Sequence, residues 1–291
     1  MIKTEDLRIR DPYIVLHNNT YYLYRSYDLA IWVFKSRDMK TWEEPVKVYT
    51  IPENSWAYTD LWAPEVHLYN GKFYMFLSLL GKNGLRGTEI SVSNTPDGFF
   101  TPISNRPATP LDKSCIDGSL IIDGGKPYMV YSHDWPDNYV KDRDVYVGEI
   151  WAVELSEDLT TPVGEPFFLF GSNECPYSAL AAAPTEWEDG IIMRYGSDAP
   201  FVNRLSNGKL FLTWSPIPAN NYVVIGAVAD NIKGPWKHCE KPVFDKNGGH
   251  AMFFADKDGT LKMCIHCPEC EPLERALILT VQEKEGEIVL V

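Results

Sequence analysis

The chain has 291 residues, a formal net charge of −13 and 45% hydrophobic residues. This length suits one large domain or two small ones, and the composition is ordinary for a globular protein. The negative charge argues against nucleic acid or an anionic membrane surface as a partner. Apolar runs stay well short of the roughly 20 residues of a membrane span, and no apolar signal region opens the chain. We expect a cytoplasmic protein, or a secreted or periplasmic one if a signal was removed.

Three of the six cysteines form the pattern Cys264-x-x-Cys267-x-x-Cys270 around His266. Such spacing occurs in zinc and iron–sulfur sites. A strand is expected at Cys264, however, and strand alternation would place Cys264 and Cys267 on opposite faces. The sequence also has no second cluster to complete a tetrahedral site. We therefore expect reduced thiols and no metal at this cluster, as in other large chains that need no disulfides.

A short β-hairpin pattern recurs five times along the chain. In the third copy, the apolar run 120–122 leads through Asp123-Gly124-Gly125 to the β-rich run 127–131. An Asp-Gly or Gly-Gly pair between two such runs is a strong hairpin signal. The other copies turn at 17–19, 70–71, 207–208 and 258–259. The sequence therefore predicts five hairpins in series.

A polar or titratable residue opens each of these hairpins: Asp11, Glu65, Asp117, Asp198 and His250. The intervals are 54, 52, 81 and 52 residues, so the third unit carries an insertion. A repeat of about 50 residues built from short strands is the signature of a β-propeller, whose inner strands line a central axis. We predict an all-β fold in which residues 1–291 form a single five-bladed β-propeller of antiparallel four-stranded blades. The five opening residues should then converge on the axis.

Three aspartates at one narrow axis suggest acid–base chemistry. Hydrolysis of a glycosidic bond with inversion needs two carboxyl groups about 6.5–9.5 Å apart, which leaves room for a water molecule. One carboxylate must be ionised to take a proton from water, and the other must hold its proton near neutral pH. A third carboxylate beside the acid raises its pKa by like-charge repulsion. The number of aspartates therefore fits this division of roles.

The motifs at the hairpin starts, taken in order and spacing, resemble glycoside hydrolase family 43. They are Arg10-Asp11-Pro12, Trp62-Ala63-Pro64-Glu65, Ile116-Asp117-Gly118-Ser119, Asp198-Ala199-Pro200-Phe201 and Gly248-Gly249-His250. The resemblance covers about residues 8–280. It implies a five-bladed propeller and an inverting glycosidase that needs no cofactor for its chemistry. Substrates of this family are mainly α-L-arabinofuranosides and β-xylosides of plant polysaccharides, so a carbohydrate is the expected partner.

The resemblance also implies a role for four of the opening residues. Asp11 would be the general base, and Asp198 the general acid. Asp117 would orient the acid and tune its pKa. His250 would lie under the site, near a bound Ca²⁺ or Na⁺ ion or an ordered water.

The acid is the point at which this chain departs from the family. The family usually has Glu-Gly-Pro where this chain has Asp198-Ala199-Pro200. Aspartate is one methylene shorter, which sets the proton donor back by roughly 1.5 Å. Glu186 or Glu188, on the preceding segment, could supply the acid instead, and a site without a competent acid is a third possibility.

Three further residues have both a substrate-binding and a structural interpretation. Trp62 could stack on a sugar ring or pack within its blade. Glu65 could bind sugar hydroxyls or simply open a blade. Arg275 resembles an arginine that reaches the pocket from the last blade of family members, but it could also form a surface ion pair with an acid such as Glu274.

Two functions from different classes fit this pattern. The first is an inverting glycosidase for α-L-arabinofuranosides, with β-xylosides as the next choice. The second is a non-catalytic, lectin-like carbohydrate-binding propeller whose acid has been lost, an alternative that the aspartate at position 198 keeps open. The sequence does not predict the oligomeric state.

Overall fold

Five four-stranded sheets follow one another along the parts of the chain that the computed structural model describes, residues 1–187, 190–216 and 221–291. In each sheet the strand order is the chain order, and all neighbours are antiparallel. We call these sheets blades one to five. Blades one and two are β2 (Tyr13–His17), β3 (Thr20–Tyr27), β4 (Ala30–Ser36) and β6 (Val46–Thr50), then β7 (Ala57–Tyr69), β8 (Lys72–Gly81), β9 (Arg86–Ser93) and β10 (Thr101–Pro102).

Blades three to five complete the series. They are β11 (Cys115–Asp123), β12 (Lys126–His133), β15 (Glu149–Leu155) and β16 (Pro162–Gly171), then β19 (Asp198–Arg204), β20 (Leu210–Ser215), β21 (Ile225–Ala229) and β22 (Lys237–His238), and finally β23 (Gly249–Ala255), β24 (Leu261–Cys267), β25 (Arg275–Lys284) and β26 (Glu287–Leu290).

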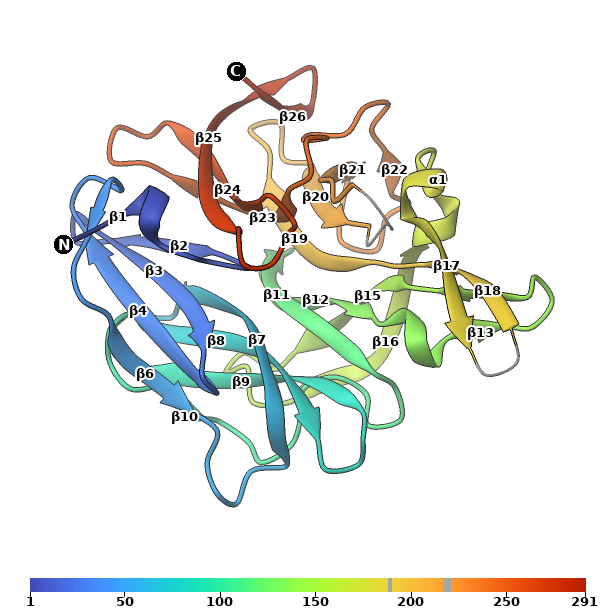
Figure 1. The fold of residues 1–291 in the computed structure, drawn as a ribbon, viewed down its shortest axis with the longest axis horizontal. Coiled ribbons are helices and arrows are strands. Elements are labelled where there is room, and N and C mark those ends of the chain that lie inside the picture. The colour runs from blue at the N-terminus through green and yellow to red at the C-terminus, as the bar shows by residue number, and fades with distance from the viewer. Residues whose placement is uncertain (188–189, 217–220) are drawn as a thin grey trace.

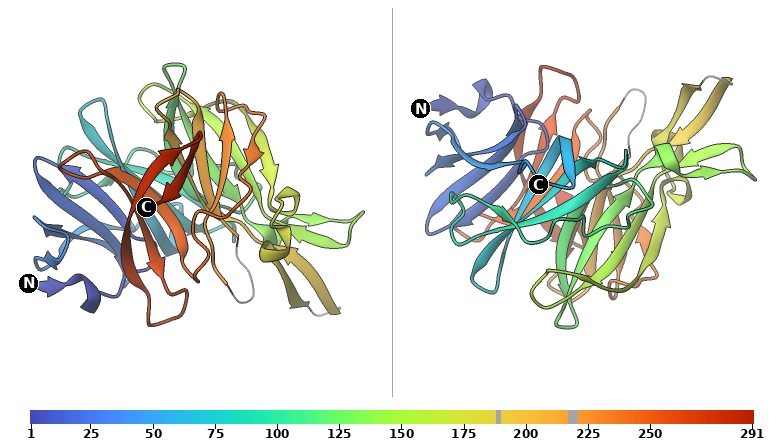
Figure 2. Two further views of the ribbon diagram at one scale, coloured as in Figure 1. Left: turned by 90° about the horizontal axis from the view of Figure 1, so that it is seen from above. Right: turned by 90° about the horizontal axis from the view of Figure 1, so that it is seen from below.

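The first strands of the five blades contact one another in a closed ring. β2 contacts β7, β7 contacts β11, β11 contacts β19, β19 contacts β23, and β23 returns to β2. The blades radiate from this ring in Figure 1, and Figure 2 shows the sheets from above and below. Buried apolar side chains form three clusters that each combine neighbouring blades. The predicted five-bladed propeller is therefore confirmed.

The predicted hairpin turns are also confirmed. Asn70 and Gly71 both have positive φ, 46° and 77°, and the same holds for Gly124 and Gly125, at 56° and 79°. Two successive positive values are typical of the type I′ turn, whose twist matches that of the flanking strands. Because only glycine, asparagine and a few other residues adopt this conformation at low cost, these Asn-Gly and Gly-Gly pairs fix where the inner strands of blades two and three end.

One position on the second strand of every blade contacts the next blade. In blades two to five it pairs with the residue at which the inner strand begins to bulge. In blade one the equivalent residue is the one two positions after Tyr24, which pairs with Tyr13. The position is serine in four blades and histidine in the fifth, and we call these five residues the inter-blade ring: Ser26, Ser78, Ser132, Ser215 and His266.

Every member of the inter-blade ring hydrogen-bonds the backbone at the start of the following inner strand. The contacts are Ser26 to the carbonyl of Leu61, Ser78 to the N–H of Asp117, Ser132 to the carbonyl of Ser197, Ser215 to the N–H of His250 and His266 to the N–H of Asp11. The last of these joins blade five to blade one. The ring thus fixes the place at which each inner strand enters the axis.

The N-terminal lead-in forms a second contact between blade five and blade one. β1 (Ile2–Lys3) pairs with β5 (Thr41–Trp42), and the 3₁₀ turn η1 (Thr4–Asp6) follows. Ile9 then donates its N–H to the carbonyl of Glu274 at 3.1 Å. The Glu274 side chain, only 1% exposed, lies 3.3 Å from Arg8 and 3.7 Å from Arg10. This carboxylate therefore joins the start of the chain to the last blade.

An additional sheet projects beyond the blades, and we call it the arm (Figure 1). Its strands are β13 (Tyr139–Val140), β14 (Val145–Val147), β18 (Gly190–Tyr195) and β17 (Ala182–Trp187), in that order. It combines two segments, one between β12 and β15 and one between β16 and β19, and the helical turn α1 (Ser178–Ala181) precedes β17. Because β14 and β18 pair in parallel, the expectation of purely antiparallel sheets holds for the blades and fails for the arm.

Two short 3₁₀ turns lie on either side of blade three's later strands, η2 (Trp135–Asp137) before the arm and η3 (Ser172–Glu174) after β16. Within the ranges described above, no helix has the length and hydropathy needed to cross a membrane.

The contact at Glu274 predicts a difference between two acids that share one arginine. Removing a partner from a buried ion pair leaves an uncompensated charge, whereas an exposed pair contributes little. Because Arg8 stays partly exposed, we expect Glu274→Ala to lower the free energy of unfolding by about 1–3 kcal/mol. Glu271→Ala, which removes an exposed partner 2.8 Å from Arg8, should change it by less than about 0.5 kcal/mol. Urea denaturation measures both, and equal losses would contradict the assigned role of Glu274.

Candidate active site

A pocket of about 450 Å³ lies where the inner strands begin, and most of the predicted site residues line it. The structure brings together Asp11, Asp117, Asp198, His250 and Trp62 in its wall. Three polar residues that the sequence had not singled out, namely Arg10, Arg86 and Asp134, also line it. The wall therefore combines carboxylates, cations and an aromatic ring.

A backbone bulge places the titratable side chains in the pocket. Each blade has a residue with left-handed φ at the bulge of its inner strand: Asp11 (49°), Ala63 (45°), Asp117 (56°), Ala199 (51°) and His250 (56°), and blade two has a second one, Asp60 (52°). In blades two to five the strand register shifts at the same point. Non-glycine residues seldom adopt this conformation, and they concentrate at functional sites.

The bulge corrects the expectation that the five opening residues occupy equivalent places. Asp11, Asp117 and His250 do so, because each is the left-handed residue of its blade. Asp198 lies one residue before the left-handed position and pairs with Ser215. Glu65 lies two residues after it and pairs with Phe76 on β8. Asp198 thus reaches the pocket from a different point of the bulge, and Glu65 does not reach it.

Asp11 is flanked by two histidines. Its Oδ1 lies 3.0 Å from Nδ1 of His250 and 3.3 Å from Nδ1 of His266. Burial pushes the pKa of Asp11 upward, but the charges and hydrogen bonds of the two histidines outweigh burial and hold this pKa well below its usual range. Asp11 is therefore ionised at neutral pH, which is the state a general base requires.

Asp117 is buried among hydrogen-bond donors. Its Oδ1 accepts the hydroxyl of Ser78 at 3.1 Å, and its Oδ2 accepts the N–H of Ala199 at 3.0 Å. Burial raises its pKa, and the charge of Asp11 adds to the rise. Because Ala199 directly follows Asp198, the second contact ties Asp117 to the strand that carries the predicted acid.

Asp198 has the environment of a carboxylic acid that keeps its proton. Burial and the neighbouring charge of Asp117 raise its pKa from 3.8 to about 8. The hydroxyl of Tyr222 donates to its Oδ1 at 2.5 Å and opposes part of this rise. Tyr222 needs a glycine beside it, because a Cβ on Gly249 would lie only 2.4 Å from its ring. Sequence reasoning missed Tyr222, which lies outside the hairpin pattern.

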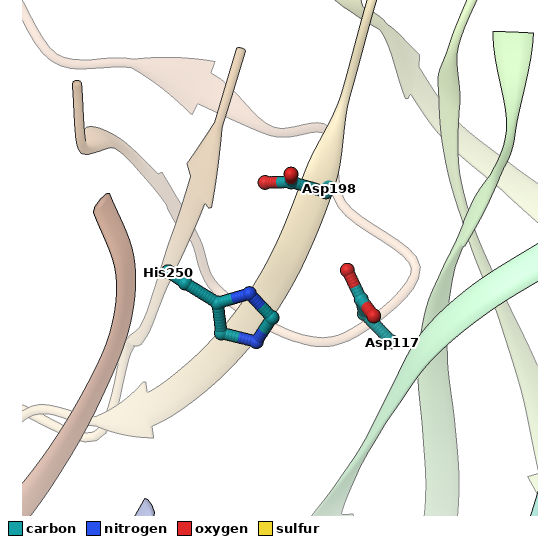
Figure 3. Close-up of side chains that lie close together, drawn as sticks. All are labelled: Asp117, Asp198 and His250. Carbon is teal, nitrogen blue, oxygen red and sulfur yellow. The ribbon is translucent and has the colours of Figure 1, made fainter. Parts of the chain in front are cut away.

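His250 lies between the base and the other two aspartates. One atom each of Asp117, Asp198 and His250 lie within 4.8 Å of one another, and the three side chains point into the same space in Figure 3. Burial alone would lower the pKa of His250, but the surrounding carboxylates, Asp11 foremost, raise it to about 10. Its charge therefore balances part of the negative charge of the pocket.

The same three residues are the candidate ligands for the predicted axial ion. They are the one candidate metal cluster in the chain as described. Ca²⁺ prefers six to eight oxygen ligands, whereas this set offers two carboxylates and an imidazole. With no ion in the pocket Asp198 and His250 both hold protons at neutral pH, so a directly bound ion would have to displace both protons. The donor set therefore does not fit a directly coordinated Ca²⁺ and suits an imidazolium among carboxylates better.

The three predicted substrate-binding residues differ in position. Trp62 lines the pocket, where the guanidinium of Arg86 lies 4.5 Å from its ring centre. Glu65 is buried outside the pocket wall and bonds His67 at 3.1 Å. Arg275 donates to the carbonyls of Glu5, Pro272 and Glu274 at the N-terminal closure, and it too is absent from the wall. The structure thus supports a pocket role for Trp62 alone.

The alternative acids are not placed at the pocket. Glu186 lies exposed on β17 of the arm, opposite Ile191. Glu188 lies outside the described residues. Asp134 is a better-placed neighbour, since burial raises its pKa to about 6 and it lines the pocket.

His266 is the second functional residue that the sequence did not reveal. One signal could have found it: the second strands end in Tyr131-Ser132 and Trp214-Ser215, and Ile265-His266 holds the same place in the last hairpin. A histidine that replaces a recurring serine therefore marks the site.

Residues 6–283 match the sequence profile of glycosyl hydrolases family 43. The chain belongs to this family. The resemblance of the hairpin motifs to glycoside hydrolase family 43 is thereby confirmed.

Structures and curated sequences in this family agree with the fold. An endo-arabinase from Bacteroides thetaiotaomicron is 34% identical with a TM-score of 0.87, and the match covers 99% of both chains. A thermostable family-43 glycoside hydrolase is 26% identical with a TM-score of 0.80, over 97% of this chain and 92% of that one. The α-L-arabinofuranosidase 43 of Humicola insolens is 21% identical over 71% of this chain and 42% of its own length. The chain thus spans less than half of the length of this curated relative.

The raised pKa of Asp198 predicts how the stability of the wild-type family-43 protein should change with pH relative to the variant Asp198→Asn. In the unfolded chain Asp198 ionises near its ordinary pKa of 3.8, whereas in the native state it stays protonated until about pH 8. Wild-type stability should therefore fall relative to the variant between about pH 4 and pH 8, by up to ~1.4 kcal/mol per pH unit, and level off above. Urea unfolding of both proteins from pH 5 to 9 measures the difference. A difference that does not change with pH would show that Asp198 is ionised in the folded protein.

Proposed function

We propose that this family-43 protein hydrolyses glycosidic bonds with inversion at the anomeric carbon. The observation that carries this proposal is the opposite shift of two buried carboxyl groups in one pocket. Histidines hold the pKa of Asp11 low, whereas burial and Asp117 raise that of Asp198 to about 8. Two carboxyl groups with separated pKa values are the requirement of acid–base catalysis.

The proposed reaction uses the side chains of the chain itself. Asp11 takes a proton from a water molecule as the water oxygen forms a bond to the anomeric carbon. The bond between that carbon and the leaving oxygen breaks, and Asp198 transfers its proton to this oxygen. Asp117 keeps the proton on Asp198 until that moment. The products are two hydroxyl-terminated sugars, with the proton lost by Asp198 replaced by the one gained by Asp11.

Tyr222 contributes to the second half of this step. Its pKa lies far above the usual range because it is buried beside Asp198 and Asp11, so it remains a phenol that donates. Once Asp198 has lost its proton, this hydrogen bond at 2.5 Å stabilises the carboxylate that remains. The bond also occupies Oδ1, which leaves Oδ2 to carry the transferred proton. A hydrogen bond to a charged acceptor is roughly twice as strong as one between neutral groups.

We propose α-L-arabinofuranosides as the substrate class, with β-xylosides next. An endo-arabinase and an arabinofuranosidase are among the relatives of this chain. A neutral sugar suits a protein with a net charge of −13, and Trp62 offers a ring face of the kind on which sugars stack. The alternative of a non-catalytic, carbohydrate-binding propeller is less well supported, because a pocket that only binds sugar does not require a protonated acid opposite an ionised base.

The substrate class and the mechanism are tested in one experiment. We expect α-1,5-arabino-oligosaccharides to be hydrolysed faster than β-1,4-xylo-oligosaccharides, and proton NMR during the first turnovers should show the β anomer of the released arabinose unit. Asp11→Asn is the control, because removal of a general base costs about 10²–10⁴ in rate. Release of the α anomer would contradict inversion. Binding of either sugar without cleavage would favour the carbohydrate-binding alternative.

A second prediction concerns the acid. A proton donor matters most when the leaving group is a sugar hydroxyl and least when it is an activated phenol that departs unprotonated. Asp198→Ala should therefore slow cleavage of an oligosaccharide by about 10²–10⁴ and cleavage of a dinitrophenyl glycoside far less. Asp198→Glu, which restores the family's glutamate, should retain activity on both. Equal losses on the two substrates would remove Asp198 as the acid, and the same comparison would pass to Asp134.

A further inference from the structure

The inter-blade ring has one exception, and it lies next to the proposed base. In blades one to four the ring residue is serine, and in blade five it is His266. The contact common to the ring does not require this change, because Ser78 and Ser215 accept the following backbone N–H at 2.8 and 3.1 Å. Nδ1 of His266 lies 3.2 Å from the backbone N of Asp11, and the neutral imidazole accepts that N–H as the serines do. The imidazole must therefore supply something that a serine does not.

The additional contacts of His266 join Asp11 to a carboxylate nearer the surface. The imidazole is fully buried and stacks on the ring of Tyr222, with the centres 5.3 Å apart. Its Nδ1 lies 3.3 Å from Oδ1 of Asp11, and its Nε2 lies 2.5 Å from Oε2 of Glu269. Because Glu269 only accepts, Nε2 carries a hydrogen. When the ring is an imidazolium, Nδ1 also carries one and donates it to Oδ1 of Asp11 in place of accepting the backbone N–H. No serine could span these two carboxylates.

Arg10 closes these contacts into a cycle. Its Nη1 lies 2.8 Å from Oε1 of Glu269, and its Nε lies 3.8 Å from Oδ2 of Asp11. The order is therefore Asp11, His266, Glu269, Arg10 and Asp11 again. Each member is held on two sides, which restricts the rotamers of all four side chains. Such a cycle is more specific than an isolated surface ion pair, which contributes little by itself.

We propose that His266, fixed by Glu269, is a positioning residue that orients the carboxylate of Asp11 so that its Oδ2 faces the attacking water. Both His250 and His266 contact Oδ1 of Asp11. Of the contacts found for the described residues, the nearest to Oδ2 is Arg10 at 3.8 Å, beyond hydrogen-bond length. This inference rests on the proposed role of Asp11 as base. His266 itself is separated from the substrate side by Asp11 and does not line the pocket.

The charges around Asp11 agree with this assignment. His250 faces it from β23, His266 from β24, Asp117 from β11 and Asp198 from β19; Arg10, Glu269 and Tyr222 complete its surroundings. Burial lowers the pKa of His266, but hydrogen bonds to Asp11 and Glu269 outweigh it and the pKa rises. With the serine found elsewhere in the ring, Asp11 would keep its backbone contact and lose one of two stabilising imidazoles.

The test variant is His266→Ser, which gives blade five the ring residue of the other four. The backbone N–H of Asp11 can still be accepted, so the change isolates the effect on the carboxylate. We expect kcat to fall about 10- to 100-fold, as for other residues that orient catalytic groups, with KM changed much less. The acidic limb of the plot of kcat/KM against pH should move to higher pH by about one unit or more. Asp11 loses a cationic neighbour in this variant, which raises its pKa. Glu269→Gln should shift the limb in the same direction by a smaller amount.

Two measurements separate positioning from a purely structural role. Ser26→Ala removes a ring contact in blade one and should lower the melting temperature without moving the acidic limb. Carbon-13 NMR of labelled aspartate carboxyls, with the Asp11 signal identified by its loss in Asp11→Asn, should show Asp11 titrating at higher pH in His266→Ser than in wild type. Loss of activity with an unmoved limb and an unmoved Asp11 signal would overturn the proposal.

The same NMR titration distinguishes a failure of the role proposed for His266 from a failure of the proposed function. If Asp11→Asn retains wild-type turnover, Asp11 is not the base and the proposed mechanism fails. Whether His266 changes the pKa of Asp11 is then judged from the carboxyl titration alone. A shift in that titration with no change in catalysis would show that His266 tunes Asp11 without positioning a base, which would also overturn the inference.

Discussion

The pocket depends on how each blade holds the next one. In a propeller the inner strands meet only at the axis, so their mutual placement depends on side chains that cross between blades. Here a single second-strand position does this in every blade, through serine in four and His266 in the fifth. Because the hydrogen bonds reach the backbone where the inner strands bulge, they set the positions of Asp11, Asp117 and His250 directly. The contact that closes the fold is thus also the one that assembles the site.

Charge balance is the second constraint on this pocket. Three buried carboxyl groups cannot all be ionised at low cost in a water-poor site. The structure resolves this by giving Asp11 two imidazoles, leaving Asp198 protonated and placing His250 within reach of all three aspartates. The unequal surroundings create an acid and a base from the same residue type. Asp198 also differs from the other two aspartates in its place in the bulge and in the hydrogen bond that it accepts from Tyr222.

Much of the fold could be predicted from the sequence because hairpins are local. Short turns of asparagine, aspartate and glycine fix each strand pair, and their spacing gives five blades. Asp11, Asp117 and His250 were found because they repeat at one position. Glu65 was misplaced because a bulge adds residues to a strand, and a one- or two-residue offset moves a side chain out of the pocket. Tyr222 acts through a contact between distant segments, which no periodic pattern encodes, and the parallel pairing within the arm was hidden for the same reason. His266 does hold a recurring position, and only its replacement of the usual serine marks it.

The arm also limits how this chain can vary. Its two segments leave blade three at separate points and meet through the pairing of β14 with β18 and through the contact of Arg194 with the Trp135 ring. If either segment were lost, the other would keep a hairpin with an unpaired edge, and exposed edges invite association with other chains. The two insertions therefore form one structural unit. Homologues should carry both or neither, and a chimaera that exchanges the arm between family members must transplant both segments together.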